Sequence, residues 1–316
     1  MKGFLLLSIV SLLHDRPICG QPLPFDTIVS FGDSNTDTGN VYNLTGNRWP
    51  SVPPYYKGRF SNGPLWIEKL GVPELMNYAY GDATIVDDNL LGDFTRANRT
   101  RVPAVRQQIV KYLSENDITN ANLSRTLHVI WAGNTEYLSN VNVSTELMVT
   151  NSCDAMEDLL LVGIDHLLII NLPPLNAFPR LVRDATLESR IVAHNNYLLT
   201  NISRLQASRT DVSMKLFDVY SLIKTLLSKQ STSTLNKVDP CWTINNRTVT
   251  AQCANPDDHV FIDSSHFSSV VHQLIADRIR QFLLSSPSPL PSRAMSLPRS
   301  SLVFVFIGPF LLKKVI

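Results

Sequence analysis

The stretch FGDSNTDTGN, Phe31 to Asn40, is the point where an apolar segment gives way to a polar turn. The residues before it, Thr27 to Phe31, are β-branched and aromatic, which predicts a short buried strand. Glycine, aspartate and asparagine follow, and these residues favour a turn. Ser34 therefore lies where a strand ends, and binding sites in open α/β sheets collect at the carboxyl ends of strands. We predict that Ser34 is a nucleophile; the alternative is an ordinary polar turn.

Three further segments carry polar residues that could act with a serine. Near the other end of the chain, Asp263 precedes His266 by three residues, a spacing that lets the carboxylate fold back on the imidazole. Between the two ends, Gly81 lies in Asn77 to Thr84 and Asn134 in Trp131 to Glu136, each just past a predicted strand. The four segments together indicate a site assembled from distant parts of the chain.

With these four blocks in this order, the chain resembles the GDSL or SGNH hydrolases. The letters S, G, N and H fall on Ser34, Gly81, Asn134 and His266. The resemblance runs from about Phe25 to Leu284 and includes the blocks GRFSNGPLW at 58–66 and NLPPL at 171–175. The segment Pro-Tyr-Tyr at 54–56 is most similar to the fungal and plant branch, which includes secreted acetylesterases of fungi.

Apolar runs alternate with longer amphipathic stretches, which predicts a parallel sheet covered on both faces. Helices are expected at Ala104 to Ser114 and Ser269 to Leu284, where apolar residues recur at helical spacing. The predicted strands are Thr27 to Phe31, Asn77 to Tyr80, Leu127 to Ala132, His166 to Leu172 and Met214 to Val219. The resemblance implies a flavodoxin-like three-layer α/β/α domain around a central five-stranded parallel sheet. We expect one catalytic domain over residues 21–284.

A serine hydroxyl becomes a useful nucleophile when a base within about 3 Å takes its proton. His266 is the candidate base, and Asp263 would orient its ring. Attack on an ester carbonyl creates an oxyanion, which fixed donors stabilise. The resemblance assigns that task to the backbone N–H groups of Ser34 and Gly81 and to the side-chain amide of Asn134.

Three positions depart from the usual family pattern. Thr135 follows Asn134 and Asp82 follows Gly81, which puts local loop hydrogen bonds in question, and Phe267 is expected to alter the wall beside His266. No spacing of Cys, His or carboxylates calls for a metal, and no cofactor is expected. Most of the other histidines considered are expected to be structural: His128, His166, His194, His259 and His272.

Residues 1–20 have a positive start at Lys2 and a short apolar run, which is typical of a secretory signal peptide. Six N-x-S/T sequons agree with secretion of a glycoprotein: Asn43, Asn98, Asn122, Asn142, Asn201 and Asn246. A net charge of +1 over 316 residues, with no basic run, gives no electrostatic footprint for nucleic acid.

In an oxidising compartment, Cys241 and Cys253 are expected to form a local disulfide that closes a surface hairpin. Cys153 would then remain a buried free thiol in a helix. Residues 285–300 are rich in Ser and Pro and read as a linker. The apolar tail at 301–316 is either a lipid-anchor attachment signal, which would fix the protein to a membrane or wall, or an unstructured tail.

These features predict a secreted, monomeric serine esterase that acts on short acetyl esters of carbohydrate. Two alternatives are a lipase or lysophospholipase for longer acyl chains, and a surface glycoprotein that keeps the fold without activity. The proline-rich loop from Trp49 to Ser61 is expected to form a stiff aromatic wall near the site. Its rings would either stack on a sugar or pack beneath the loop.

Overall fold

Five strands form a parallel sheet within the part of the chain that the computed structural model describes, residues 21–86, 100–139, 143–182, 184, 186–245 and 248–285. The strands are β1 (Thr27–Gly32), β2 (Glu74–Asn77), β3 (Thr126–Trp131), β4 (His166–Ile170) and β5 (Ser213–Phe217). Their spatial order is β2-β1-β3-β4-β5, with every neighbouring pair parallel. This is the flavodoxin-like order, whose switch point lies where β1 adjoins β3.

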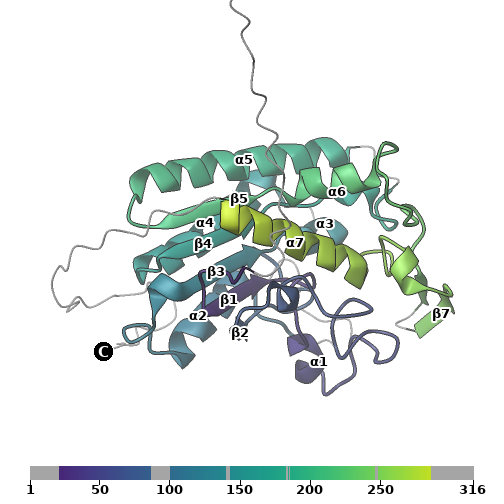
Figure 1. Ribbon diagram of the computed structural model, residues 1–316, viewed down its shortest axis with the longest axis horizontal. Coiled ribbons are helices and arrows are strands. Elements are labelled where there is room, and N and C mark those ends of the chain that lie inside the picture. Colours follow the sequence, from purple (N-terminus) through teal and green to yellow (C-terminus); the bar gives the residue numbers. More distant parts are fainter. Residues whose placement is uncertain are drawn as a thin grey trace, which may run out of the picture.

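Helices cover both faces of the sheet, as Figure 1 shows, so the predicted three-layer α/β/α architecture is confirmed. On one face α4 contacts both α2 and α5, and on the other α7 contacts the 3-10 turn Glu68–Leu70. The helices are α1 (Asn40–Leu44), α2 (Val105–Glu115), α3 (Asn134–Leu138), α4 (Thr145–Leu161), α5 (Leu187–Ser208), α6 (Val219–Leu227) and α7 (Ser269–Ser285). None of the helices in the described ranges is long and apolar enough to cross a membrane.

Most of the predicted segments agree with the observed ones to within two residues, but the prediction for β2 is wrong. The strand was expected at Asn77 to Tyr80, whereas it begins at Glu74 and ends at Asn77. Beyond Asn77, the N–H groups of Tyr78 and Tyr80 still donate to the Ser30 and Gly32 carbonyls of β1 at 2.8 and 3.1 Å. On the free edge of the sheet, Asn40 Nδ2 donates to the carbonyls of Asn77 and Ala79 at 2.9 and 2.8 Å. Asn77 Oδ1 accepts the Ala79 N–H at 2.8 Å. The regular strand ends three residues before the predicted end, although two backbone hydrogen bonds to β1 continue beyond it.

The predicted surface hairpin is present, formed by β6 (Trp242–Asn245) and β7 (Thr248–Gln252). A disulfide between Cys241 and Cys253 closes it. Cys153 is a free, half-buried thiol in α4, and burial raises its pKa to about 11. The signal peptide, the linker and the tail lie outside the described residues, as do the sequons Asn98, Asn142 and Asn246.

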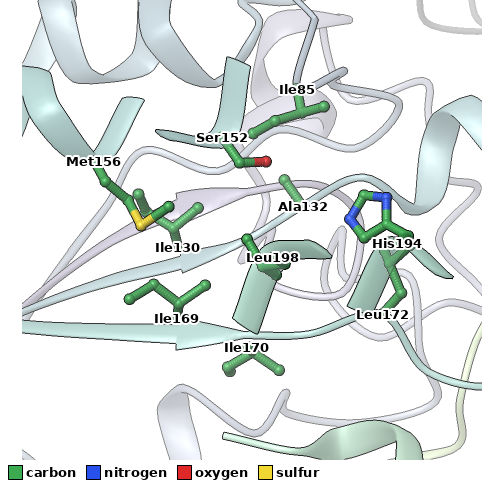
Figure 2. Close-up of a pocket in the computed structure, with 10 residues that line it drawn as sticks. All are labelled: Ile85, Ile130, Ala132, Ser152, Met156, Ile169, Ile170, Leu172, His194 and Leu198. Carbon is green, nitrogen blue, oxygen red and sulfur yellow. The ribbon is translucent and has the colours of Figure 1, made fainter. Parts of the chain in front are cut away.

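One hollow lies inside the fold between the sheet and the helices α4 and α5, and Figure 2 shows its apolar lining around His194. Its volume of about 10 Å³ leaves room for about one water molecule. The one hydroxyl on its wall, Ser152 Oγ, already donates to the Met148 carbonyl at 3.0 Å. The hollow is therefore a packing void of the core, too small to take a substrate.

Peptide mapping without reduction should recover Cys241 joined to Cys253, with Cys153 alkylated only after denaturation. The expectation follows because the two bridged residues flank the paired strands β6 and β7 and are themselves joined by a backbone hydrogen bond, while Cys153 lies on a helix covering the sheet. The matched measurement is the same map after reduction, in which Cys153, Cys241 and Cys253 are each alkylated. A bridge that includes Cys153 would contradict the pairing.

Candidate active site

The turn after β1 and the loop before α7 bring a serine, a histidine and an aspartate into one hydrogen-bonded chain. Ser34 Oγ lies 3.1 Å from His266 Nε2. On the other side of the ring, His266 Nδ1 lies 2.9 and 2.7 Å from the two carboxylate oxygens of Asp263. Because Nδ1 faces a carboxylate, it carries the proton and Nε2 is left to accept from the serine. This is the arrangement that general-base activation of a nucleophile requires.

The Asp263 carboxylate is buried, yet it is held in its charged form. Burial raises its pKa, but the charge and hydrogen bond of His266 outweigh that effect, together with hydrogen bonds from the Tyr55 hydroxyl and from the Ser265 N–H at 2.7 Å. The pKa of Asp263 consequently lies below its ordinary value. A carboxylate that stays charged can orient the imidazole and stabilise an imidazolium.

The glycine that precedes this turn allows β1 and β3 to approach each other closely. Gly32 has a φ of +154°, and a Cβ there would lie 2.1 Å from the Trp131 carbonyl oxygen. Gln108 of α2 binds both backbone groups of Gly32, accepting from its N–H at 2.8 Å and donating to its carbonyl at 2.9 Å. The end of β1 is thereby fixed immediately before the serine turn.

A second buried aspartate, Asp33, holds Asn134 beside the serine. Asp33 Oδ2 accepts the Asn134 backbone N–H at 3.3 Å and one side-chain N–H at 2.9 Å. Its Oδ1 accepts the Asn35 N–H at 3.0 Å. Burial raises the pKa of Asp33, and these hydrogen bonds act in the opposite direction. Since an amide has two N–H groups, Asn134 keeps one for an oxyanion.

The Gly81 N–H, the third expected oxyanion donor, binds a carboxylate in this structure. It donates to Asp37 Oδ2 at 2.8 Å. Asp37 also accepts backbone N–H groups at the start of α1, among them that of Asn40 at 2.6 Å. Burial raises the pKa of Asp37 to about 6 against these bonds. The expectation that Gly81 serves the oxyanion stays a prediction, and it requires the N–H to turn away from Asp37 or to be shared with it.

The serine and histidine open on a hollow of about 30 Å³. Its other lining residues are Trp49, Phe60, Asp82, Thr135, Leu138, Ser139, Arg180 and Ser265. Two of the three departures from the family pattern, Asp82 and Thr135, thus border the site. Phe267 does not line the hollow: it is fully buried and packs on Phe178, with ring centroids 5.0 Å apart. Its expected effect on the wall is wrong because the side chain turns into the core.

A model of the GDSL-like lipase/acylhydrolase family matches residues 28–279. The chain belongs to this family.

Relatives of this GDSL-family chain come from bacteria and plants. A phosphatidylcholine-sterol acyltransferase of Aeromonas hydrophila is 32% identical over 62% of the chain and 58% of its own length. A thermolabile hemolysin of Vibrio parahaemolyticus is 23% identical over 82% of the chain and 64% of its own length. A GDSL esterase/lipase of Arabidopsis thaliana is 24% identical over 88% of the chain and 96% of its own length. The chain therefore spans less than two thirds of the first two relatives.

The other histidines of this GDSL-family chain have structural surroundings. His128 Nε2 lies 3.1 Å from the Tyr112 hydroxyl, and His194 Nδ1 lies 3.3 Å from the Tyr137 hydroxyl. Burial lowers the pKa of His128 to about 3, and that of His194 to about 4. They remain neutral members of the core. Among the described residues, no group of three or more His, Cys, Asp or Glu side chains could hold a metal ion.

Sequence reasoning missed four side chains that support the site: Asp33, Asp37, Tyr55 and Glu136. The first two were quoted within the serine stretch but had no assigned task; an acid in the turn after a buried strand is the signal that could have marked them. Glu136 is 1% exposed, and its Oε1 accepts the Ile85 and Val86 N–H groups at 2.6 and 3.2 Å. Burial raises the pKa of Glu136 to about 7.

Replacing Ser34 by alanine should lower kcat by about three orders of magnitude or more, because the hydroxyl is the attacking group. A fluorophosphonate probe followed by peptide mass spectrometry should label Ser34 in the natural protein and nothing in the variant. Ser139→Ala is the matched control, since Ser139 lines the same hollow and should leave labelling intact. Labelling of another serine, or an active Ser34→Ala protein, would refute the assignment.

Glu136→Gln should make the melting temperature less sensitive to pH. The folded-state pKa of Glu136, about 7, exceeds its ordinary value of 4.5, so the folded state binds the extra proton and loses stability as pH rises through that window. The melting temperature of the variant minus that of the natural protein should therefore increase from about pH 5 to about pH 8. Glu146→Gln, at an exposed position of α4, is the control and should give a constant difference. A constant difference for Glu136→Gln would contradict the prediction.

Proposed function

We propose that this chain is a secreted serine esterase that hydrolyses short, acetyl-type esters of carbohydrate through an acyl-enzyme on Ser34. The observation that carries the proposal is the hydrogen-bonded chain Asp263–His266–Ser34 at the mouth of a small hollow. Ser34 Oγ attacks the ester carbonyl carbon while His266 Nε2 takes its proton. The ring then returns that proton to the departing alkoxide, and water repeats the sequence to release the acid.

The size of the hollow supports a short acyl group. A volume of about 30 Å³ holds one or two groups of the size of a water molecule or a methyl, and Trp49 and Phe60 close it on one side. These rings are 4% and 2% exposed, so they fit the alternative of packing beneath the loop better than stacking on a sugar face. The carbohydrate part of the proposal therefore rests on the resemblance to secreted acetylesterases.

Secretion is supported by the signal-like residues 1–20 and by the sequons. Of the three sequons in the described ranges, Asn43 and Asn122 are exposed and accessible to a glycosyltransferase, whereas Asn201 is half-buried in α5. We propose glycosylation at the exposed pair first.

A second candidate function is acyl hydrolysis or transfer from phospholipid. It is favoured by the phosphatidylcholine-sterol acyltransferase among the relatives. Arg180, an exposed residue that lines the hollow, offers a cation for a phosphate group. The two candidates share the serine chemistry and differ in the length of the acyl chain.

Activity on p-nitrophenyl esters should fall as the acyl chain lengthens from acetate to palmitate. Each methylene that cannot be buried forgoes about 0.8 kcal/mol, so kcat/KM for chains of about eight carbons or more should lie well below that for acetate. Release of acetate from acetylated xylan and of fatty acid from phosphatidylcholine vesicles would be measured beside it. A profile that rises steadily to palmitate, with fatty acid released from the vesicles, would replace the acetylesterase proposal by the phospholipid one.

Leu138→Ala tests whether the hollow sets the preferred acyl length, because Leu138 borders the hollow and truncating this side chain enlarges the hollow. The optimum should move to a longer acyl chain by one or a few carbons. Leu161→Ala, at a 64% exposed leucine of α4, is the matched control and should leave the profile unchanged.

A further inference from the structure

Tyr55 contacts the catalytic aspartate from a loop 208 residues away in the sequence. Its hydroxyl donates to Asp263 Oδ2, the same oxygen that lies 2.7 Å from His266 Nδ1. The tyrosine is 2% exposed. The hydrogen-bonded chain that begins at Ser34 is thus continued by one more member, Tyr55, behind the carboxylate.

The ring of Tyr55 is fixed on several sides. Its centroid lies 5.0 Å from that of Trp242, 6.1 Å from Trp49 and 6.2 Å from Phe60, each pair edge to face. Its backbone N–H donates to the Ser51 carbonyl at 3.1 Å. A buried ring in such a setting has one position for its hydroxyl, so the direction of the donated hydrogen bond is fixed.

The disulfide-closed hairpin holds the aspartate segment against this ring. The backbone N–H groups of Cys241 and Trp242 donate to the carbonyls of Phe261 and Ile262 at 3.0 and 2.7 Å. The hairpin thereby pairs with the two residues immediately before Asp263, while the side chain of Trp242 packs on Tyr55. The hairpin therefore contacts both the hydrogen-bond donor, Tyr55, and the segment that carries the acceptor, Asp263.

We propose that Tyr55 is a positioning residue that acts through Asp263: it holds the carboxylate in the orientation that points His266 Nε2 at Ser34. Tyr55 touches neither the substrate nor the reacting atoms. The proposal rests on the proposed function, since it assigns the support of that same site. The Ser265 N–H holds Asp263 Oδ1 at 2.7 Å, and the Tyr55 hydroxyl adds a second donor of fixed direction on Oδ2. Donors on both oxygens restrict rotation of the carboxylate about its terminal bond.

The hydrogen bond also sets how strongly Asp263 acts on the imidazole. A donated phenolic hydrogen spreads the negative charge of the carboxylate, so its removal leaves more of that charge facing His266. The protonated ring should then be favoured, and the acid limb of the pH profile should move to higher pH. Within the described part of the chain, the other titratable or charged groups that face His266 are Asp33, Asp82, Arg180 and His272, and Tyr55→Phe alters none of them.

Tyr55→Phe keeps the ring and removes only the hydroxyl. It should lower kcat about tenfold with KM changed less than about twofold, and should shift the acid limb of kcat/KM upward. The matched control is Tyr112→Phe, which removes an equally buried hydroxyl that contacts His128 instead; its kcat and pH profile should stay within about twofold of the natural protein. Melting temperatures of both variants would show that each is folded.

The double variant Tyr55→Phe with Asp263→Asn decides whether Tyr55 acts through the aspartate. If Tyr55 acts through Asp263, kcat of the double variant should equal that of Asp263→Asn alone, because the carboxylate that Tyr55 orients is already gone. A full, multiplicative loss in the double variant, or an unshifted acid limb in Tyr55→Phe, would overturn the proposal. The low-field NMR resonance of the His266 Nδ1–H proton can be measured without turnover. It should shift in Tyr55→Phe and stay unchanged in the control Tyr112→Phe. An unshifted resonance in Tyr55→Phe would also overturn the proposal.

Ser34→Ala measured in the same assay separates this proposal from the proposed function. An active Ser34→Ala protein would remove the site assignment and the role of Tyr55 with it. An inactive Ser34→Ala protein beside an unaffected Tyr55→Phe would overturn the role of Tyr55 alone and leave the esterase proposal in place.

Discussion

The Asp33 carboxylate is the group on which the geometry of this site depends, because it joins the ends of the two strands at the switch point of the sheet. It is fully buried, and its two oxygens accept hydrogen bonds from the residue after the serine and from Asn134 after β3. A buried charge is tolerated only where its oxygens find such donors. The strands β1 and β3 must therefore end in register, with Gly32 opposite Trp131, and that register sets the distance from serine to asparagine.

Two other buried acids likewise join separate segments around the site by accepting their backbone N–H groups. Asp37 joins the start of α1 to Gly81, and Glu136 joins α3 to the backbone at Ile85 and Val86. Loops at the carboxyl end of a parallel sheet have few apolar partners of their own, so backbone N–H groups gathered on a carboxylate can hold them. The loss of ordinary solvation raises the pKa of each acid. The stability of the site loops is thereby coupled to pH.

The aromatic loop supplies the other half of the site. Trp49 and Phe60 close the hollow, and the Phe60 ring lies 5.1 Å from the His266 ring. The same ring explains the glycine of the second block, because a Cβ on Gly81 would lie 2.2 Å from it. The loop residues that follow hold the histidine segment: Ser61 Oγ donates to the Phe267 carbonyl at 3.0 Å, and Asn62 Oδ1 accepts the Ser269 N–H at 2.8 Å. One loop thus lines the hollow and supports the segment that carries His266.

The sequence by itself determined the layered fold, four of the five strands, the hairpin with its disulfide, and the residues Ser34, Asp263 and His266. These follow from periodicity and from motifs confined to short segments, where neighbours in the chain are neighbours in space. It could not predict the true end of β2, because the backbone at Asn77 and Ala79 is bound by the side chain of Asn40, more than 35 residues away in the chain. The partners of Asp37 and Tyr55 and the inward turn of Phe267 were likewise decided only by tertiary structure. A hydrogen bond between residues 208 positions apart depends on where two loops contact each other in the folded sheet, and no local sequence pattern can predict that contact.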